Sequence, residues 1–76
     1  MKNFPIKVLL IDDDEEDYIL TRYIFDEFKS DKFSLEWIDN YADGLEALKK
    51  RLHDIILLDY HLGEKNGLEL LREAID

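Results

Sequence analysis

The chain has 76 residues, a net charge of −9 and no cysteine, so it can build one small domain without disulfides or thiolate metal sites. With 46 % hydrophobic and 38 % charged residues it has the composition of a globular domain rather than a disordered segment. The acidity argues against nucleic acid or an anionic membrane as a direct partner. The first apolar run is too short for a signal peptide or a membrane span, so we expect a cytoplasmic protein.

Strand and helix patterns alternate along the chain. We predict strands at residues 6–11, 33–38 and 54–59, helices at 15–28, 42–52 and 68–75, and a loop with an Asn-Gly turn at 63–67. This order is β-α-β-α-β-α, and right-handed crossovers would place helices on both sides of a parallel sheet. The predicted fold class is therefore α/β, with a doubly wound parallel sheet.

The first predicted helix has Asp14 as its N-cap, and Leu20, Ile24 and Phe28 repeat every four residues as its expected buried face.

For the second predicted helix, Asp39 and Asn40 offer cap residues, and Leu45, Leu48 and Leu52 are expected to point inward. His53, before the third strand, is expected at a turn or on the surface.

The two most hydrophobic runs of the chain both end in aspartates. Val8–Ile11 is followed by Asp12–Asp14, and Ile55–Leu58 is followed by Asp59. Apolar runs without alternation are typical of strands that are buried on both faces of a parallel sheet. The carboxyl ends of neighbouring parallel strands meet at the edge where open α/β sheets bind ligands. The sequence therefore predicts a carboxylate pocket that holds a cation.

Gathering carboxylates in this way is unfavourable without a counterion. Two of them about 4 Å apart repel by roughly 4 kcal/mol at an effective dielectric of 20. Oxygen ligands of this kind suit Mg²⁺, Mn²⁺ or Ca²⁺, and a carboxylate beside Mg²⁺ can attack phosphorus to give an aspartyl phosphate. Asp59 is the better candidate nucleophile, because it stands alone while Asp12 and Asp13 pair as metal ligands. The alternative is that Asp13 and Asp14 only cap a helix and Asp59 a turn.

Three segments, KVLLIDDDEED, NYADGLEALKK and HDIILLDYHLGEKNGLELL, resemble in order and spacing the receiver domain of bacterial response regulators. The resemblance implies a flavodoxin-like sheet with strand order 2-1-3 and a site for Mg²⁺, with Mn²⁺ as a substitute. It also implies a phosphoacceptor module rather than an enzyme in its own right. The expected phosphoryl donor is a sensor histidine kinase or a phosphotransfer protein.

Carried over by position, the resemblance assigns the site residues. Asp12 and Asp13 match the acidic pair that binds the metal, and Asp59 matches the phosphoacceptor, which also binds it. His61 would give its backbone carbonyl to the metal, and Gly67 matches the glycine that ends the loop over the site.

The family domain has five βα units, whereas this sequence has patterns for three. We therefore expect residues 1–76 to form a partial receiver domain, truncated before the strand-four hydroxyl residue and the strand-five lysine. Phosphoryl transfer would be weakened and switching lost. The third strand would keep an open edge, through which two copies could associate.

Two other functions remain open from the residues. Asp12 and Asp14 fit the first half of the haloacid-dehalogenase phosphatase motif, although Glu16 stands where that motif has threonine or valine. Alternatively the chain is a non-catalytic folding or dimerisation module whose acids cap helices.

Overall fold

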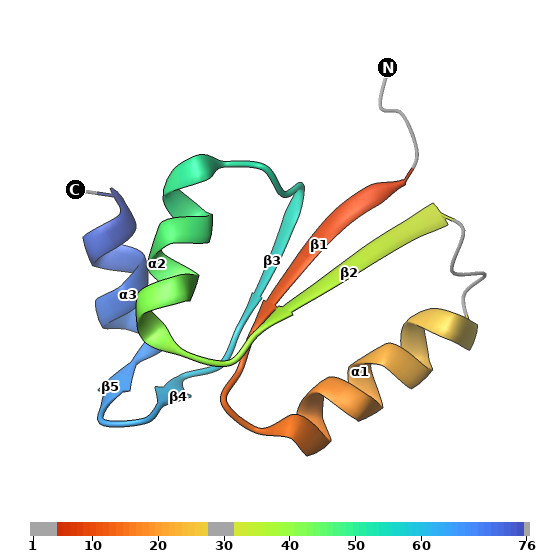
Figure 1. Cartoon of the computed structure of the whole chain (residues 1–76), viewed down its shortest axis with the longest axis horizontal. Helices are drawn as coiled ribbons and strands as arrows, with labels where there is room; N and C mark the ends of the chain where they lie inside the picture. The colour runs from red at the N-terminus through yellow and green to blue at the C-terminus, as the bar shows by residue number, and fades with distance from the viewer. Residues whose placement is uncertain (1–4, 28–31, 76) are drawn as a thin grey trace.

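The computed structural model describes residues 5–27 and 32–75 (Figure 1). Its central element is a three-stranded parallel sheet with strand order β2-β1-β3, formed by β1 (Ile6–Ile11), β2 (Phe33–Ile38) and β3 (Ile55–Leu58). The helices are α1 (Glu15–Glu27), α2 (Tyr41–Lys50) and α3 (Gly67–Ile75), and a short antiparallel hairpin joins β4 (His61–Leu62) to β5 (Lys65–Asn66). The predicted α/β class and the strand order 2-1-3 are confirmed.

The helices lie on opposite faces of the sheet, with α1 on one face and both α2 and α3 on the other (Figure 1). The middle strand β1 is covered on both faces, so the residues of its apolar run are all buried. Leu9 and Ile11 pack against Leu70 of α3. A Cβ at Gly44 would lie only 3.0 Å from the Ile11 side chain, so this glycine lets α2 approach the sheet closely.

The α1 helix does not bury the face that the sequence predicted. Leu20 is 59 % exposed and Ile24 is also exposed, and Phe28 lies outside the described residues. The covered face instead carries Tyr18 and Phe25, seven residues apart, which pack against the cluster around β2. The period-four prediction was wrong because aromatic stacking, rather than aliphatic spacing, decides how α1 lies on the edge strand.

Capping residues at both ends set the bounds of the α2 helix. The Asn40 side chain accepts a hydrogen bond from the Asp43 N–H at 2.9 Å, as predicted for an N-cap. Arg51 adopts the left-handed conformation (φ 54°) and its N–H donates to the Leu48 carbonyl, which ends the helix before the predicted residue 52. Leu52 is therefore exposed rather than inward-facing.

The segment after β3 is a hairpin and not the loop that the sequence predicted. The chain reverses at Gly63, whose φ is +64°, rather than at the Asn-Gly pair. Asn66 instead caps α3: its side chain accepts from the Glu69 N–H at 2.9 Å, and the Glu69 carboxylate accepts from the Asn66 N–H at 3.2 Å. This reciprocal capping starts α3 at Gly67, one residue earlier than expected.

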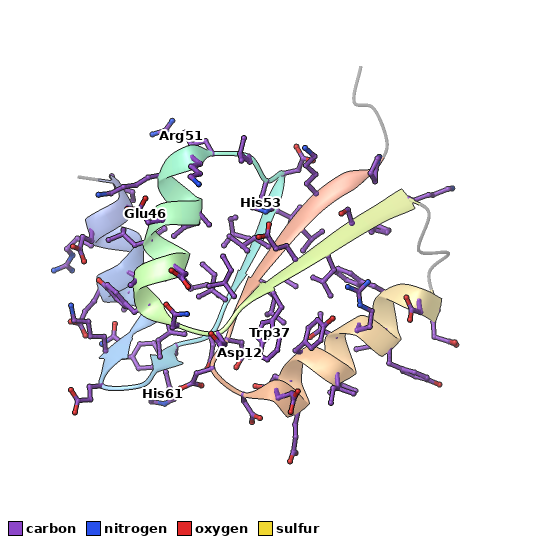
Figure 2. The ribbon with its side chains drawn as sticks, in the orientation of Figure 1. Asp12, Trp37, Glu46, Arg51, His53 and His61 are labelled. Atoms are coloured by element: carbon purple, nitrogen blue, oxygen red, sulfur yellow. The ribbon has the colours of Figure 1, made fainter. Side chains whose placement is uncertain are left out.

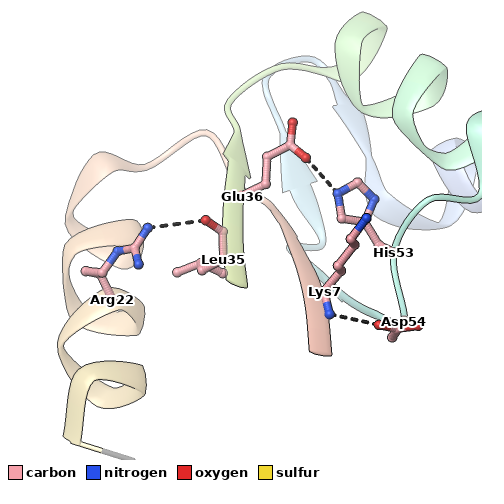
Figure 3. A network of polar contacts seen from close by, with 6 residues as sticks. All are labelled: Lys7, Arg22, Leu35, Glu36, His53 and Asp54. Atoms are coloured by element: carbon pink, nitrogen blue, oxygen red, sulfur yellow. Dashed lines mark hydrogen bonds and ion pairs between the residues drawn. The ribbon is translucent and has the colours of Figure 1, made fainter. Parts of the chain in front are cut away.

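Polar contacts tie the amino ends of the strands together, as Figure 3 shows. The Lys7 N–H donates to the Asp54 carboxylate at 2.8 Å. The His53 side chain is only 9 % exposed and its Nε2 lies 2.7 Å from the Glu36 carboxylate. His53 thus lies in the connection from α2 to β3, as predicted for a turn residue, but its ring is largely covered rather than on the surface, because it folds down against β2.

Within the described residues, β3 pairs with β1 alone, and Ile55 and Ile56 are 42 % and 38 % exposed. In the same part of the chain, no helix combines the length and apolar character needed to cross a membrane.

Candidate functional site

Asp12 and Asp59 lie together at the carboxyl edge of the sheet, because β1 and β3 are adjacent and parallel. Ile11 of β1 and Leu58 of β3 are the last residues of the two strands that pair with each other, and the aspartates follow them directly. The Asp59 N–H donates to the Ile11 carbonyl at 2.9 Å, and the Asp12 N–H donates to the Ile38 carbonyl at 3.1 Å. Backbone hydrogen bonds therefore place both aspartates, as the sequence predicted for this edge.

A third carboxylate completes this group. Asp17, in the first turn of α1, lies with Asp12 and Asp59 so that one carboxylate oxygen of each is within 4.8 Å of the others. Asp12 is buried (6 % exposed), Asp59 is half-buried and Asp17 is exposed. Asp17 was not among the site residues predicted from the sequence. The available signal was that α1 begins at Glu15, so its first turn lies close to the end of β1.

Asp13, the second predicted metal ligand, is not a member of this close group. Its Oδ2 accepts a hydrogen bond from the Gly63 N–H at 3.0 Å, which ties the end of β1 to the β4–β5 hairpin. The structure thus brings Asp13 to the same edge of the sheet but turns its carboxylate toward the hairpin. Its role as a ligand stays a prediction.

The remaining predicted residues surround Asp59. His61 begins β4 and is exposed, and its ring meets the Tyr60 ring edge-on; Figure 2 shows it on the hairpin side of Asp12. The use of its carbonyl for a metal stays a prediction. Gly67 is buried, and a Cβ there would lie 2.5 Å from the Asp59 carbonyl oxygen. Only glycine allows α3 to start this close to the Asp59 backbone.

The grouping of carboxylates changes the acidity of Asp12. The pKa of Asp12 is raised to about 6, mainly by burial and in addition by contact with Asp17 and the charge of Asp59, while the hydrogen bond from the Asp14 N–H lowers it. That N–H donates to Asp12 Oδ1 at 2.9 Å. Two charges 4.8 Å apart repel by about 3 kcal/mol at an effective dielectric of 20, before screening by water. The group therefore favours a bound cation or a shared proton.

The donor set fits a small divalent cation. All three side chains offer anionic oxygen, the ligand type that Mg²⁺ and Mn²⁺ prefer. An octahedral ion with bonds of about 2.1 Å holds its ligand oxygens about 3.0 Å apart when adjacent and about 4.2 Å apart when opposite. The three carboxylate oxygens lie within 4.8 Å of one another, which is close to these separations.

Trp37 anchors the backbone of the site. Its indole Nε1–H donates to the Asp12 carbonyl at 2.8 Å, and its ring stacks on Tyr18 with centroids 4.5 Å apart. Figure 2 shows Trp37 beside Asp12 at the end of the sheet. This contact could not be predicted from the sequence, because the alternation of apolar and polar residues in β2 does not show which group the indole reaches.

A cavity of about 460 Å³ lies elsewhere, between α2, α3 and β5. Its walls include Tyr41, whose hydroxyl donates a hydrogen bond to the Glu73 carboxylate at 2.5 Å. The Lys65 ammonium lies over the Tyr41 ring, 4.4 Å from the ring centroid. None of the three grouped aspartates lines it, so the cavity and the carboxylate group are separate features.

The sequence matches the model of the response regulator receiver domain family over residues 8–74. The chain is 37 % identical over 68 residues to the transcriptional regulatory protein CiaR of Streptococcus pneumoniae, covering 90 % of this chain and 29 % of that protein. It is 31 % identical over 68 residues to the autoinducer 2 sensor kinase/phosphatase LuxQ of Vibrio vulnificus, covering 90 % of this chain and 8 % of that protein.

Among solved structures, a MaeR response-regulator mutant bound to sulfate is similar, with a TM-score of 0.75 and 22 % identity. The match covers 92 % of this chain and 57 % of the MaeR chain, and at this identity it supports the fold alone.

The chain belongs to the response regulator receiver domain family. It is a receiver domain of two-component signalling, and such domains act as phosphoacceptor modules. It spans only 8 % and 29 % of the two curated relatives, which are a sensor kinase and a transcriptional regulator.

Proposed function

We propose that this receiver domain accepts a phosphoryl group on Asp59 in a reaction that depends on Mg²⁺, with Mn²⁺ as a substitute. The donor is a phosphohistidine on a sensor histidine kinase or a phosphotransfer protein. The observation that carries the proposal is the group of carboxylates at the carboxyl edge of β1 and β3. The chain is the acceptor of the group and not an enzyme in its own right.

In this proposal Asp59 is the nucleophile and also a ligand of the cation. An Asp59 carboxylate oxygen attacks phosphorus, the P–N bond of the donor breaks, and the imidazole leaves with a proton. Asp12, Asp13 and the His61 carbonyl hold the cation together with Asp59. When bound, the cation would supply positive charge beside the phosphoryl oxygens and reduce their repulsion with the site carboxylates. Gly67 and the backbone bond to Ile11 keep Asp59 at the end of its strand.

The structural match to the three βα units of this chain covers 57 % of the MaeR chain. Phosphoryl transfer by this segment alone would be weak, because the lysine that stabilises the phosphoryl charge is expected on a later strand. The proposed location is the cytoplasm, and the acidic net charge argues against direct contact with nucleic acid or an anionic membrane.

A direct test is to incubate the chain with a phosphoramidate, with and without Mg²⁺, and to follow the intact mass. The expected result is a gain of one phosphoryl group that needs Mg²⁺ and disappears in Asp59→Asn. Glu16→Gln is the matched control, because it removes one exposed carboxylate of α1 that is outside the group. Labelling of Asp59→Asn at the wild-type level would contradict the proposal. A folded chain without any response to Mg²⁺ would favour the folding or dimerisation module instead.

Self-association through β3 is a second proposal, supported by its exposed side chains. β3 is apolar on both faces, and Ile55 and Ile56 keep over a third of their surface exposed. Open edges of this kind pair with other strands unless charge blocks them. Sedimentation over a range of concentrations should show a dimer that Ile56→Lys abolishes. Leu20→Lys, at an apolar residue that is more exposed but lies on α1, should leave it intact. A folded monomer at high concentration would contradict this proposal.

A further inference from the structure

Asp17 lies where a ligand of the proposed cation site would have to lie. Its carboxylate is grouped with those of Asp12 and Asp59, although it comes from a different element of the fold. The start of α1 also fixes its backbone: the Asp17 N–H donates to the Asp14 carbonyl at 3.1 Å, and the Thr21 hydroxyl donates to the Asp17 carbonyl at 2.7 Å. The position of Asp17 is thus set by the helix and not by a free loop.

Helix capping does not account for this carboxylate. An acid at the third helical position commonly accepts from the N–H of the N-cap residue. Here the N-cap is Asp14, whose own carboxylate accepts from the Glu16 N–H at 2.9 Å. The Asp14 N–H donates to Asp12 Oδ1 rather than to Asp17. The helix dipole would favour an acid anywhere in this turn, so it does not explain why Asp17 meets Asp12.

The Asp12 backbone cannot easily move away from Asp17. Asp12 is held on one side by the hydrogen bond from its N–H to the Ile38 carbonyl and on the other by the Trp37 indole at its carbonyl. The two carboxylates therefore face each other from fixed backbones, with Asp59 as the third. Asp13, by contrast, uses an oxygen on the Gly63 N–H.

We infer that Asp17 is a further ligand of the divalent cation, directly or through a bound water, beside the ligands of the proposed site. The inference rests on the proposed cation site and adds a ligand that the acidic pair after β1 does not include. Its chemistry is that of a hard oxygen donor for Mg²⁺ or Mn²⁺. A fourth carboxylate near the ion, beside those of Asp12, Asp13 and Asp59, should increase the affinity.

The test is a Mg²⁺ titration of the full chain, followed by the amide and Trp37 indole signals in ¹H–¹⁵N spectra. The indole is a local reporter because it is hydrogen-bonded to Asp12. Asp17→Asn should raise the Kd at least tenfold, and the matched variant Glu16→Gln should change it less than twofold. Asp17→Glu, which keeps the charge, should bind more tightly than Asp17→Asn.

A second readout separates ligation from helix capping. Without divalent ions, Asp17→Asn should be at least as stable to urea as the wild type, because it relieves repulsion with Asp12. Loss of a cap would instead lower the stability. If Asp59→Asn abolished Mg²⁺ binding but Asp17→Asn and Glu16→Gln had equal Kd values, the inference about Asp17 would be overturned and the cation site would stand. A wild-type chain that binds no Mg²⁺ would overturn the proposed cation site as well.

Discussion

The burial of Asp12 makes the stability of the domain depend on pH in a predictable direction. Folding raises the pKa of this carboxyl from 3.8 to about 6, so the native state binds more protons than the unfolded state between these values. Stability should therefore fall as the pH rises from about 4 to 6 and stay low above it. Each pKa unit corresponds to about 1.4 kcal/mol, so ionised Asp12 destabilises the native state by about 3 kcal/mol at pH 7.

The Asp12→Asn variant isolates this effect, because asparagine keeps an oxygen that can accept from the Asp14 N–H but carries no charge. We expect it to be more stable than the wild type by up to about 3 kcal/mol at pH 7.5 in a chelator. Near pH 4 the two proteins should be almost equally stable, since Asp12 is then protonated. Urea unfolding followed by Trp37 fluorescence measures both differences, and comparing the variants cancels the titration of distant groups.

Divalent ions should reduce this difference. At ten times the Kd, Mg²⁺ stabilises the wild type by about 1.4 kcal/mol, and it should stabilise Asp12→Asn less. Asp26→Asn is the control, because Asp26 is an exposed acid on α1 outside the carboxylate group. A difference between wild type and Asp12→Asn that is the same at pH 4 and pH 7.5 would refute the reasoning, as would an Asp12→Asn variant that is no more stable at pH 7.5.

Three further substitutions test two positions around the site and one at the opposite end of the sheet. Gly67→Ala places a Cβ 2.5 Å from the Asp59 carbonyl, so it should destabilise the domain by about 1–3 kcal/mol and weaken Mg²⁺ binding in a titration; unchanged affinity would contradict this. Trp37→Phe removes the indole donor to Asp12 and should lower the free energy of unfolding by about 1 kcal/mol, measured by circular dichroism in urea; wild-type stability would argue against an anchoring role. His53→Ala removes a buried ring and its contact with a carboxylate, so about 1–3 kcal/mol should be lost with Mg²⁺ affinity intact, because this histidine lies at the opposite end of the sheet.

The three strands of the parallel sheet were predictable because their apolar residues mark them in the sequence. β1 and β2 have the predicted bounds, and β3 is shorter than predicted by one residue at each end. Asp54 and Asp59 fall outside β3, although their N–H groups donate to β1 carbonyls at 2.7 and 2.9 Å. The strand order followed from the resemblance, and the confirmed order is what brings the carboxyl ends of β1 and β3 together.

Helix faces were harder to predict, because spacing does not say which neighbour a helix meets. The sequence offers α1 two faces, an aliphatic one with Leu20 and Ile24 and a mixed one with Tyr18, Arg22 and Phe25. The structure covers the mixed face, where Tyr18 stacks on Trp37 and the Arg22 guanidinium donates to a β2 carbonyl at 3.2 Å. The aliphatic face stays exposed.

The same packing explains why only part of the site could be predicted. Asp12 and Asp59 follow their strands directly, so parallel pairing is enough to bring them together. Asp17 joins them only because α1 lies against β2 through Tyr18, the next residue along the helix, whose ring rests on the indole that holds Asp12. Removing that stack should therefore move Asp17 relative to Asp12. A Tyr18→Ala variant that kept wild-type Mg²⁺ affinity would show that the first turn of α1 is positioned by its caps alone.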